Sequence, residues 1–270
     1  MINLGKMTEK YRIAGYSERN ADARVCQDIV LRAIERSDFG RNVTIKGGVV
    51  MRSITGNVRR ATEDLDLDFI RYSLEDSSIR YFVSKLNWLE GITIEIKDDK
   101  IEQLSQQEYS GKRVFIIISD DVGNSIESKL DLGVHANMKV EQDMYCFDVC
   151  MDDEGASLLI NSCEQIFAEK LRSLLRFGPL STRYKDIFDF CYLKDHVNVS
   201  RLAECINTYI IDEPAMREKD MNDIRSRISV TFSNRQFRNN VERAGDRNWL
   251  QIDVGIAFKM IQEFLETIKL

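Results

Sequence analysis

Proline and histidine are scarce in this sequence, and its cysteines are not paired. The 270 residues include two prolines, two histidines (His135 and His196) and six cysteines, without a Cys-x-x-Cys motif. Few prolines together with 43% hydrophobic residues indicate a folded chain without long disordered tracts. Zinc sites are not expected from so few imidazoles and unpaired cysteines. The cysteines instead predict reduced, mostly buried thiols of a cytosolic protein.

Long apolar runs are missing as well. No segment approaches the roughly 20 apolar residues of a membrane-spanning helix, and residues 1–6 lack the apolar core of a signal peptide. The sequence therefore predicts a cytoplasmic protein without a membrane partner. A net charge of −6 does not indicate a general nucleic-acid-binding protein. Basic residues nevertheless concentrate in residues 169–185 and 217–247, and such clusters are either a solvated surface or a surface for a polyanion.

The spacing of apolar residues changes near residue 155. Before it, alternation predicts strands at residues 43–46, 64–69, 92–97, 114–119, 126–134 and 144–149, with a helix at 21–36. After it, helical spacing predicts helices at 162–177, 201–211 and 254–270, with a short helix carrying Asp186 and Asp189. The expected fold is α/β (α+β), a mixed sheet with flanking helices. A core lobe over residues 1–155 precedes a helical lobe over 156–270 that contributes to an active-site crevice.

Acidic and apolar residues alternate in the segment from Asp64 to Phe69. As a strand, this segment places Asp64, Asp66 and Asp68 on one face, with successive carboxylates about 7 Å apart. Such crowding of like charges is unfavourable unless a cation lies among them. Carboxylate oxygens suit Mg²⁺, which completes its shell with water and phosphate oxygens. The alternative is an edge strand whose charges meet solvent and discourage aggregation.

A glycine pair follows the first predicted strand. Gly47 and Gly48 come directly after Val43–Lys46, and residues 49–54 are compatible with a helix. A strand, a Gly-Gly turn and a helix N-terminus expose backbone N–H groups that can hold phosphate. The pair is neither a Walker A loop nor a Gly-x-Gly-x-x-Gly motif. By itself a glycine pair is most often a plain turn, so its meaning depends on the acidic strand that follows.

These residues carry a resemblance to a known family. Lys46-Gly47-Gly48 and the segment from Arg60 to Leu67 resemble the first motif of the AbiEii-type nucleotidyltransferase toxins. This family belongs to the DNA-polymerase-β-like superfamily and occurs in type IV toxin–antitoxin and phage-defence systems. Residues 169–172 and 185–189 are similar to its later motif, so the resemblance spans about residues 43 to 195. Residues 49–51 depart from the family's usual Thr-Ala-Leu, which removes a hydroxyl beside the glycines.

The resemblance implies a Mg²⁺-dependent nucleotidyltransferase that transfers a nucleoside monophosphate from a nucleoside triphosphate to an acceptor hydroxyl. The implied acceptor is RNA, with the tRNA 3′ end as the leading candidate, and the implied outcome is toxicity restrained by a cognate antitoxin. The implied site residues fall into three overlapping sets: catalytic residues (Asp64, Asp66, Asp131, Lys170, Asp186), nucleotide-binding residues (Lys46, Gly47, Gly48, Arg60, Lys170) and the ligands of an expected two-metal site (Asp64, Asp66, Asp131). Two alternatives stay open, namely nucleotide transfer onto a protein hydroxyl and a catalytically silent RNA- or protein-binding module.

Two of these residues also stand out for physical reasons. Asp131 lies on the polar side of a predicted strand, although it could instead be an ordinary surface aspartate paired with Lys129 or a neighbour. Lys170 lies along the apolar stripe of its helix, where a lysine must be paired, desolvated or extended toward solvent. We expect Asp186 or a nucleotide phosphate to pair with Lys170, the alternative being a lysine that merely covers the core. His135 has no visible catalytic partner and is predicted to be structural.

Overall fold

The structure is a computed structural model of the whole chain, and it describes residues 2–104, 111–135 and 140–270. The chain divides into two compact units, Met1–Asn161 and Ser162–Leu270. The predicted division at residues 155–156 falls just before the last strand of the first unit. Residues 156–160 belong with the first unit because they hydrogen-bond to strands of its sheet.

The first unit is built on a seven-stranded mixed sheet in the order β3-β4-β5-β2-β1-β7-β6. The β1–β7 and β2–β5 pairs are parallel, and the other pairs are antiparallel. This arrangement confirms the predicted α/β fold with a mixed sheet. In chain order its elements are α1 (Leu4–Ile13), α2 (Glu18–Arg36), β1 (Val43–Lys46), α3 (Gly47–Thr55), the 3-10 helix η1 (Val58–Arg60), β2 (Leu65–Phe69), α4 (Asp76–Ser84), β3 (Ile92–Leu104), β4 (Gly111–Asp120), β5 (Ser125–Val134), β6 (Asp143–Phe147) and β7 (Ala156–Ile160).

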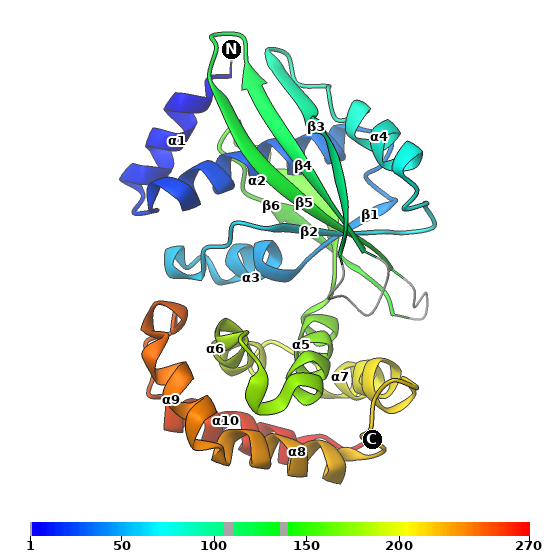
Figure 1. Cartoon of the computed structure of the whole chain (residues 1–270), viewed down its shortest axis with the longest axis vertical. Helices are drawn as coiled ribbons and strands as arrows, with labels where there is room; N and C mark the ends of the chain where they lie inside the picture. Colours follow the sequence, from blue (N-terminus) through cyan, green and yellow to red (C-terminus); the bar gives the residue numbers. More distant parts are fainter. Residues whose placement is uncertain (1, 105–110, 136–139) are drawn as a thin grey trace. The chain divides into compact units, whose positions relative to one another are not determined.

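Strand alternation separates an apolar and a charged face of this sheet. In β2, Leu65 and Leu67 are buried, and their neighbours across β5, Leu130 and Leu132, are buried as well. Helix α2 packs against β5 and β7, while α1 lies beside α2 and α4 beside β3 (Figure 1). The side chains between these leucines alternate to the opposite face, so the charged residues of β2 and β5 share that face.

The second unit is helical. Its elements are α5 (Cys163–Phe177), the 3-10 helix η2 (Gly178–Leu180), α6 (Tyr184–Leu193), α7 (Val199–Ile206), a π-helical turn η3 (Asn207–Ile211), α8 (Met221–Ser233), α9 (Arg235–Arg243), the 3-10 helix η4 (Gly245–Arg247) and α10 (Val254–Thr267). Ser162 caps α5 by accepting a hydrogen bond from the Gln165 N–H at 3.1 Å. Helices α8 and α10 pack together (Figure 1), where the rings of Phe232 and Phe258 stack 4.1 Å apart.

Membrane insertion finds no support in these helices. Among the residues that the structure describes, none of the helices combines the length and the apolar character that a membrane span requires.

The cysteines differ in their environments. All six occur as free thiols, and Cys26, Cys191 and Cys205 are buried, whereas Cys146 is exposed. Burial raises the pKa of the Cys26, Cys191 and Cys205 thiols to about 12. The prediction of mostly buried thiols thus holds for three of the six, whereas Cys150 and Cys163 are partly exposed and Cys146 is exposed.

Alkylation of the native protein should therefore be selective. The thiolate is the reactive form, and a thiol with a pKa near 12 is ionised at only about one part in 10⁴ at pH 8. We expect iodoacetamide at pH 8 to label Cys146 well before Cys26, Cys191 or Cys205, as measured by peptide mass spectrometry. All six should react once the protein is unfolded in guanidinium chloride. Labelling of Cys191 as fast as Cys146 in the native protein would contradict the described packing.

Candidate active site

Charged residues from four neighbouring strands form one row across the sheet of the first unit. The strand registers place Lys46 of β1 opposite Asp66 of β2, and Asp66 opposite Asp131 of β5. Asp131 in turn lies opposite Arg113 of β4. Residues directly opposite one another in paired strands point to the same face. The resulting cross-strand row, Lys46–Asp66–Asp131–Arg113, carries two acids between two bases.

Arg113 holds Asp131 by two hydrogen bonds. Its Nε and Nη2 donate to the two oxygens of Asp131, each at 2.7 Å, and Asp131 is 7% exposed. The hydrogen bond to Asp131 raises the pKa of Arg113, and the charges of Asp131, Asp64 and Asp66 raise it further against the opposing effect of burial. Sequence reasoning missed Arg113, although it lies on an alternating strand. The alternative partner considered for Asp131, Lys129, pairs with Asp64 instead, at 2.8 Å.

The flanking carboxylates are also paired. Lys46 Nζ lies 2.6 Å from Asp68 Oδ1, and Asp68 is almost fully buried. Asp64 precedes β2 and is more exposed than Asp68. Neighbouring cations therefore relieve much of the charge crowding that the alternation of acids predicts.

The carboxylates still fit a divalent cation of the Mg²⁺ type. Within the described parts of the chain, no cluster of three or more Asp, Glu, His or Cys side chains is arranged to hold a metal ion. Mg²⁺, however, takes only one or two protein carboxylates and completes its shell with water and phosphate oxygens. Asp64 and Asp66 offer hard oxygen donors on one strand segment, and Asp66 lies against the glycine turn described next.

The Gly47–Gly48 turn opens helix α3 without a side-chain cap. Gly47 has φ +64°, a backbone conformation that glycine adopts without strain. Lys46 at the N-cap makes no capping hydrogen bond through its side chain, and the first turn of α3 contains no acid. In contrast, Ser17 caps α2 with its hydroxyl. The first N–H groups of α3 thus lack the side-chain acceptor that caps α2, which suits an anion.

Both glycines are required because neighbouring side chains approach closely. A Cβ atom on Gly47 would overlap Oδ2 of Asp66, and one on Gly48 would lie 2.7 Å from the Cβ of Thr62. The carboxylate of Asp66 therefore lies directly against the turn. A phosphate seat and a carboxylate that can hold a cation meet at this point.

Replacement of Gly48 by alanine should destabilise the protein. The new methyl group would displace either α3 or the chain at Thr62, and such overpacking typically costs about 1–3 kcal/mol. We expect a lower midpoint in urea denaturation. Gly5→Ala is a matched control because Gly5 also lies in a helix, and its nearest neighbour would be 3.5 Å away. That variant should be neutral or slightly stabilised by helix propensity, and equal loss in both variants would contradict the described contact.

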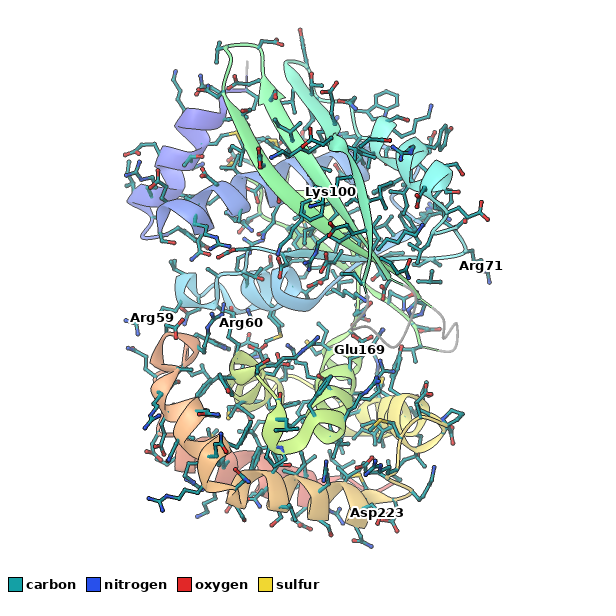
Figure 2. All side chains as sticks on the ribbon, viewed as in Figure 1. Arg59, Arg60, Arg71, Lys100, Glu169 and Asp223 are labelled. Carbon is teal, nitrogen blue, oxygen red and sulfur yellow. The ribbon has the colours of Figure 1, made fainter. Side chains whose placement is uncertain are left out.

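Arg60 lies at the end of η1, the short helix that packs against α3 (Figure 2). It is 3% exposed. A buried guanidinium on this segment is compatible with the predicted nucleotide-binding role, which stays a prediction.

In the second unit, Lys170 joins two aspartates. Lys170 of α5 pairs with Asp186, and its Nζ lies 2.9 Å from Oδ2 of Asp189, both aspartates belonging to α6. Trp249 Nε1 donates to Oδ1 of Asp189 at 2.9 Å, and Asp189 has no exposed surface. The expected pairing of Lys170 with Asp186 is present. Sequence reasoning missed the buried Asp189–Trp249 contact, because nothing local links residues 60 positions apart.

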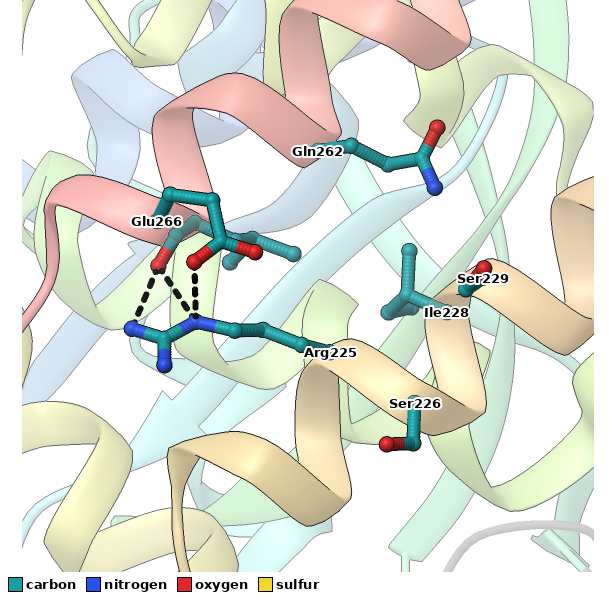
Figure 3. Close-up of a pocket in the computed structure, with 7 residues that line it drawn as sticks. Arg225, Ser226, Ile228, Ser229, Gln262 and Glu266 are labelled. Carbon is teal, nitrogen blue, oxygen red and sulfur yellow. Dashed lines mark hydrogen bonds and ion pairs between the residues drawn. The ribbon is translucent and has the colours of Figure 1, made fainter.

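A hollow of about 460 Å³ also lies in the second unit, lined by α8 and α10 (Figure 3). Its arginine, Arg225, lies 3.3 Å from Glu266 and donates to the carbonyl of Leu265 at 3.2 Å. The guanidinium group of Arg225 is therefore already paired with acceptors at the C-terminal end of α10. None of the predicted site residues lines this hollow.

His135 has a structural environment, as the sequence predicts. It is 4% exposed, its backbone N–H donates to the Phe69 carbonyl at 2.9 Å, and its ring contacts the Gln142 amide at 2.9 Å.

Comparison with known proteins gives one extensive match. The profile of a family described as "Nucleotidyl transferase AbiEii toxin, Type IV TA system" matches residues 29–252. No curated protein matches the sequence. Among solved structures, an antigenic nucleotidyltransferase-like protein from Paracoccidioides brasiliensis has a TM-score of 0.46 at 13% identity, over 88% of this chain and 93% of that one. That likeness is too distant to support an argument, whereas the profile covers most of the chain and both compact units.

Proposed function

Because the chain belongs to the AbiEii family of nucleotidyl transferase toxins of type IV toxin–antitoxin systems, we propose that it transfers a nucleoside monophosphate from a nucleoside triphosphate to a hydroxyl group of RNA, in a reaction that requires Mg²⁺. The protein is a nucleotidyltransferase and a toxin by family. Among the finer assignments, the metal and the phosphate-binding residues of the first unit rest on the geometry of that unit, whereas the acceptor and the roles of Lys170 and Asp186 rest on the second unit and on the family motif.

One observation carries the proposal. The carboxylate of Asp66 lies against Gly47, at the N-terminus of a helix that lacks a side-chain cap. A nucleoside triphosphate brings both a polyanion and bound Mg²⁺, and it would therefore need a phosphate seat next to a carboxylate. The contact between Asp66 and Gly47 supplies both within one side-chain length.

Different residues of the first unit would bind the phosphates and the metal ion. The N–H groups at the start of α3 would hold phosphate oxygens, and Lys46 and Arg60 would add positive charge. Asp64 and Asp66 would hold Mg²⁺, which neutralises charge on the phosphates and on the leaving group. The acceptor hydroxyl would attack the α-phosphate in line, and pyrophosphate would leave.

Asp131 would orient the acceptor or contribute to a second metal site. Arg113 donates one hydrogen bond to each carboxylate oxygen of Asp131. A carboxylate has about four lone-pair positions, so about two remain for other donors or a cation. The bidentate contact fixes the orientation of the carboxylate beside Asp66. Asp131 is thus held in place while it retains acceptor capacity toward substrate.

Lys170 and Asp186 of the second unit are proposed to act on phosphate as well. Two carboxylates hold the ammonium group of Lys170, so its position is fixed. A fixed ammonium is a compact point charge of the kind that binds phosphate. This role rests on the family motif that residues 169–172 and 185–189 resemble.

The acceptor is proposed to be RNA, with the 3′ end of tRNA as the first candidate. Exposed arginines of the second unit, such as Arg217, Arg235 and Arg243, support a polyanionic acceptor. A nucleoside triphosphate and tRNA are both cytoplasmic molecules, which supports a cytoplasmic site of action. The type IV toxin–antitoxin family supports a cognate antitoxin as a further partner.

Labelling distinguishes these possibilities. The protein is incubated with each α-³²P-labelled nucleoside triphosphate, Mg²⁺ and total RNA, and both the RNA and protein fractions are examined, together with pyrophosphate release. We expect one triphosphate to label small RNA, and chelation of Mg²⁺ to abolish the label. Label on protein would move the acceptor to a protein hydroxyl. Absence of both label and pyrophosphate with all four triphosphates and authentic tRNA would overturn the proposal.

A further inference from the structure

Arg52 is a buried arginine, and two of its three guanidinium nitrogens have no acceptor among the residues that the structure describes. It lies in the second half of α3 and is 4% exposed. Among the residues described, its Nε and Nη2 atoms have no hydrogen-bond partner. Arg32, equally buried in the same unit, differs because its two terminal nitrogens pair with Glu35 and Asp152.

A buried, unpaired guanidinium is unfavourable. Removal of a cation from water costs free energy that only a paired anion or several hydrogen bonds can offset. Neither α3 nor η1 contains an acidic residue, and although the adjacent strand β2 brings Asp66 against the first turn of α3, no carboxylate of the described residues accepts from Nε or Nη2 of Arg52. The free protein thus keeps a charged group in an environment where an apolar side chain would be more stable. Such a cost is typical of a residue that is paired only when a ligand is present.

Arg52 lies on the same side of α3 as the glycine turn. Residues four apart on a helix lie on the same face, so Arg52 shares a face with Gly48. That face lies against the segment from η1 to Thr62, since η1 packs on α3 and Thr62 lies over Gly48. Helical side chains lean toward the N-terminus, and one turn of helix is about 5.4 Å long. The guanidinium of Arg52 can therefore reach the level of the first N–H groups of α3.

We propose that Arg52 binds a phosphate group of the nucleoside triphosphate, next to the N–H groups of α3. This inference rests on the proposed nucleotidyl transfer and adds a binding residue to it. A guanidinium presents a planar pair of donors that matches two phosphate oxygens, and burial strengthens the attraction. Arg52 would provide a second positive contact beside a turn that lacks the hydroxyl expected at residues 49–51.

The variant Arg52→Met should be more stable than the wild-type protein and yet bind triphosphate more weakly. Methionine fills much of the same volume without the charge, so the free protein should become more stable, by about 2 °C or more in thermal denaturation. Affinity should fall at least about tenfold for the nucleoside triphosphate that the wild-type protein binds, and for inorganic tripolyphosphate, both measured with Mg²⁺ by calorimetry. Arg52→Lys keeps the positive charge but loses the planar pair of guanidinium donors, so it should retain only part of the affinity for triphosphate.

Arg32→Met is the matched control. It removes a buried arginine with two carboxylate partners, and it should lower the melting temperature while leaving the affinity for triphosphate unchanged. If Arg52→Met also lowers the melting temperature by several degrees or fails to fold, Arg52 is structural and the inference is wrong. Unchanged affinity in Arg52→Met, with wild-type binding intact, likewise overturns it. A wild-type protein that binds none of the four triphosphates overturns the proposed function itself.

The same calorimetry separates two sources of phosphate. Weaker tripolyphosphate and triphosphate binding with unchanged RNA binding supports the inference. The reverse pattern would assign Arg52 to the RNA backbone and contradict the inference as stated.

Discussion

Replacement of Asp66 by asparagine should abolish nucleotidyl transfer while the protein stays folded. Asp66 is the acid that lies against the glycine turn and beside Asp131, so it is the best placed to hold a cation at the phosphates. Loss of one preorganised electrostatic contact typically costs about 2–4 kcal/mol of barrier, a rate loss on the order of a hundredfold or more. Stability should be unchanged or slightly higher because repulsion between Asp66 and Asp131 is relieved.

Glu127→Gln is the matched control for this experiment. Glu127 lies on β5 in the same sheet and pairs with Lys97 at 2.5 Å, but it is more exposed and lies away from the glycine turn. Its neutralisation should leave transfer unchanged. Incorporation of labelled nucleotide with Mg²⁺ gives the activity, and thermal denaturation gives the stability. An Asp66→Asn protein with near-normal transfer would remove the carboxylates of β2 from the mechanism.

Replacement of Lys170 by methionine should have the largest effect on stability. The substitution removes the ammonium group next to Asp189, a carboxylate without exposed surface. The hydrogen bond from the Trp249 indole to Asp189 stays. Breaking a buried ion pair on one side typically costs about 3–5 kcal/mol. We expect a corresponding drop in the free energy of unfolding, measured by urea denaturation.

The role of Lys170 in transfer is tested by two further variants. The double variant Lys170→Met/Asp189→Asn should regain much of the stability because the fully buried charge of Asp189 is removed, while the partly exposed Asp186 alone loses its cation. Its transfer rate should still fall about a hundredfold or more if the ammonium binds phosphate. Lys170→Arg keeps a charge for the aspartates and should recover little activity, since guanidinium and ammonium differ in shape. Normal transfer in the double variant would make Lys170 purely structural.

The sequence predicts which faces of β2 and β5 carry the charged residues of the candidate site, because local alternation determines the face, whereas the roles of these residues stay predictions. β1 occurs at Val43–Lys46 as predicted, and β2 begins one residue later than predicted, at Leu65. Strand alternation alone places Asp66 and Asp131 on polar faces, and the family resemblance links them. The helical spacing around Lys170 likewise predicts a lysine that needs a partner, which Asp186 provides.

Features that depend on long-range contacts were not predictable. β7 is a five-residue strand without clear alternation of charge, and its pairing with β1 decides where the first unit ends. The pairing of Arg113 with Asp131 depends on the register between β4 and β5, which sequence periodicity does not fix. That Nε and Nη2 of Arg52 find no acceptor among the described residues depends on the packing around α3, which sequence periodicity does not give.

The balanced charges of the cross-strand row, two acids between two bases, have a consequence for how ligands bind together. Lys46 and Arg113 balance Asp66 and Asp131, so the row is neutral before any ligand arrives. A divalent cation alone would then face two competing positive charges, and a triphosphate alone would face two negative ones. Each ligand supplies the charge that the other lacks, so their binding free energies should be coupled, and each should raise the affinity for the other by the same factor. Under the proposed function, the enzyme would therefore take up the metal–nucleotide complex as a single substrate.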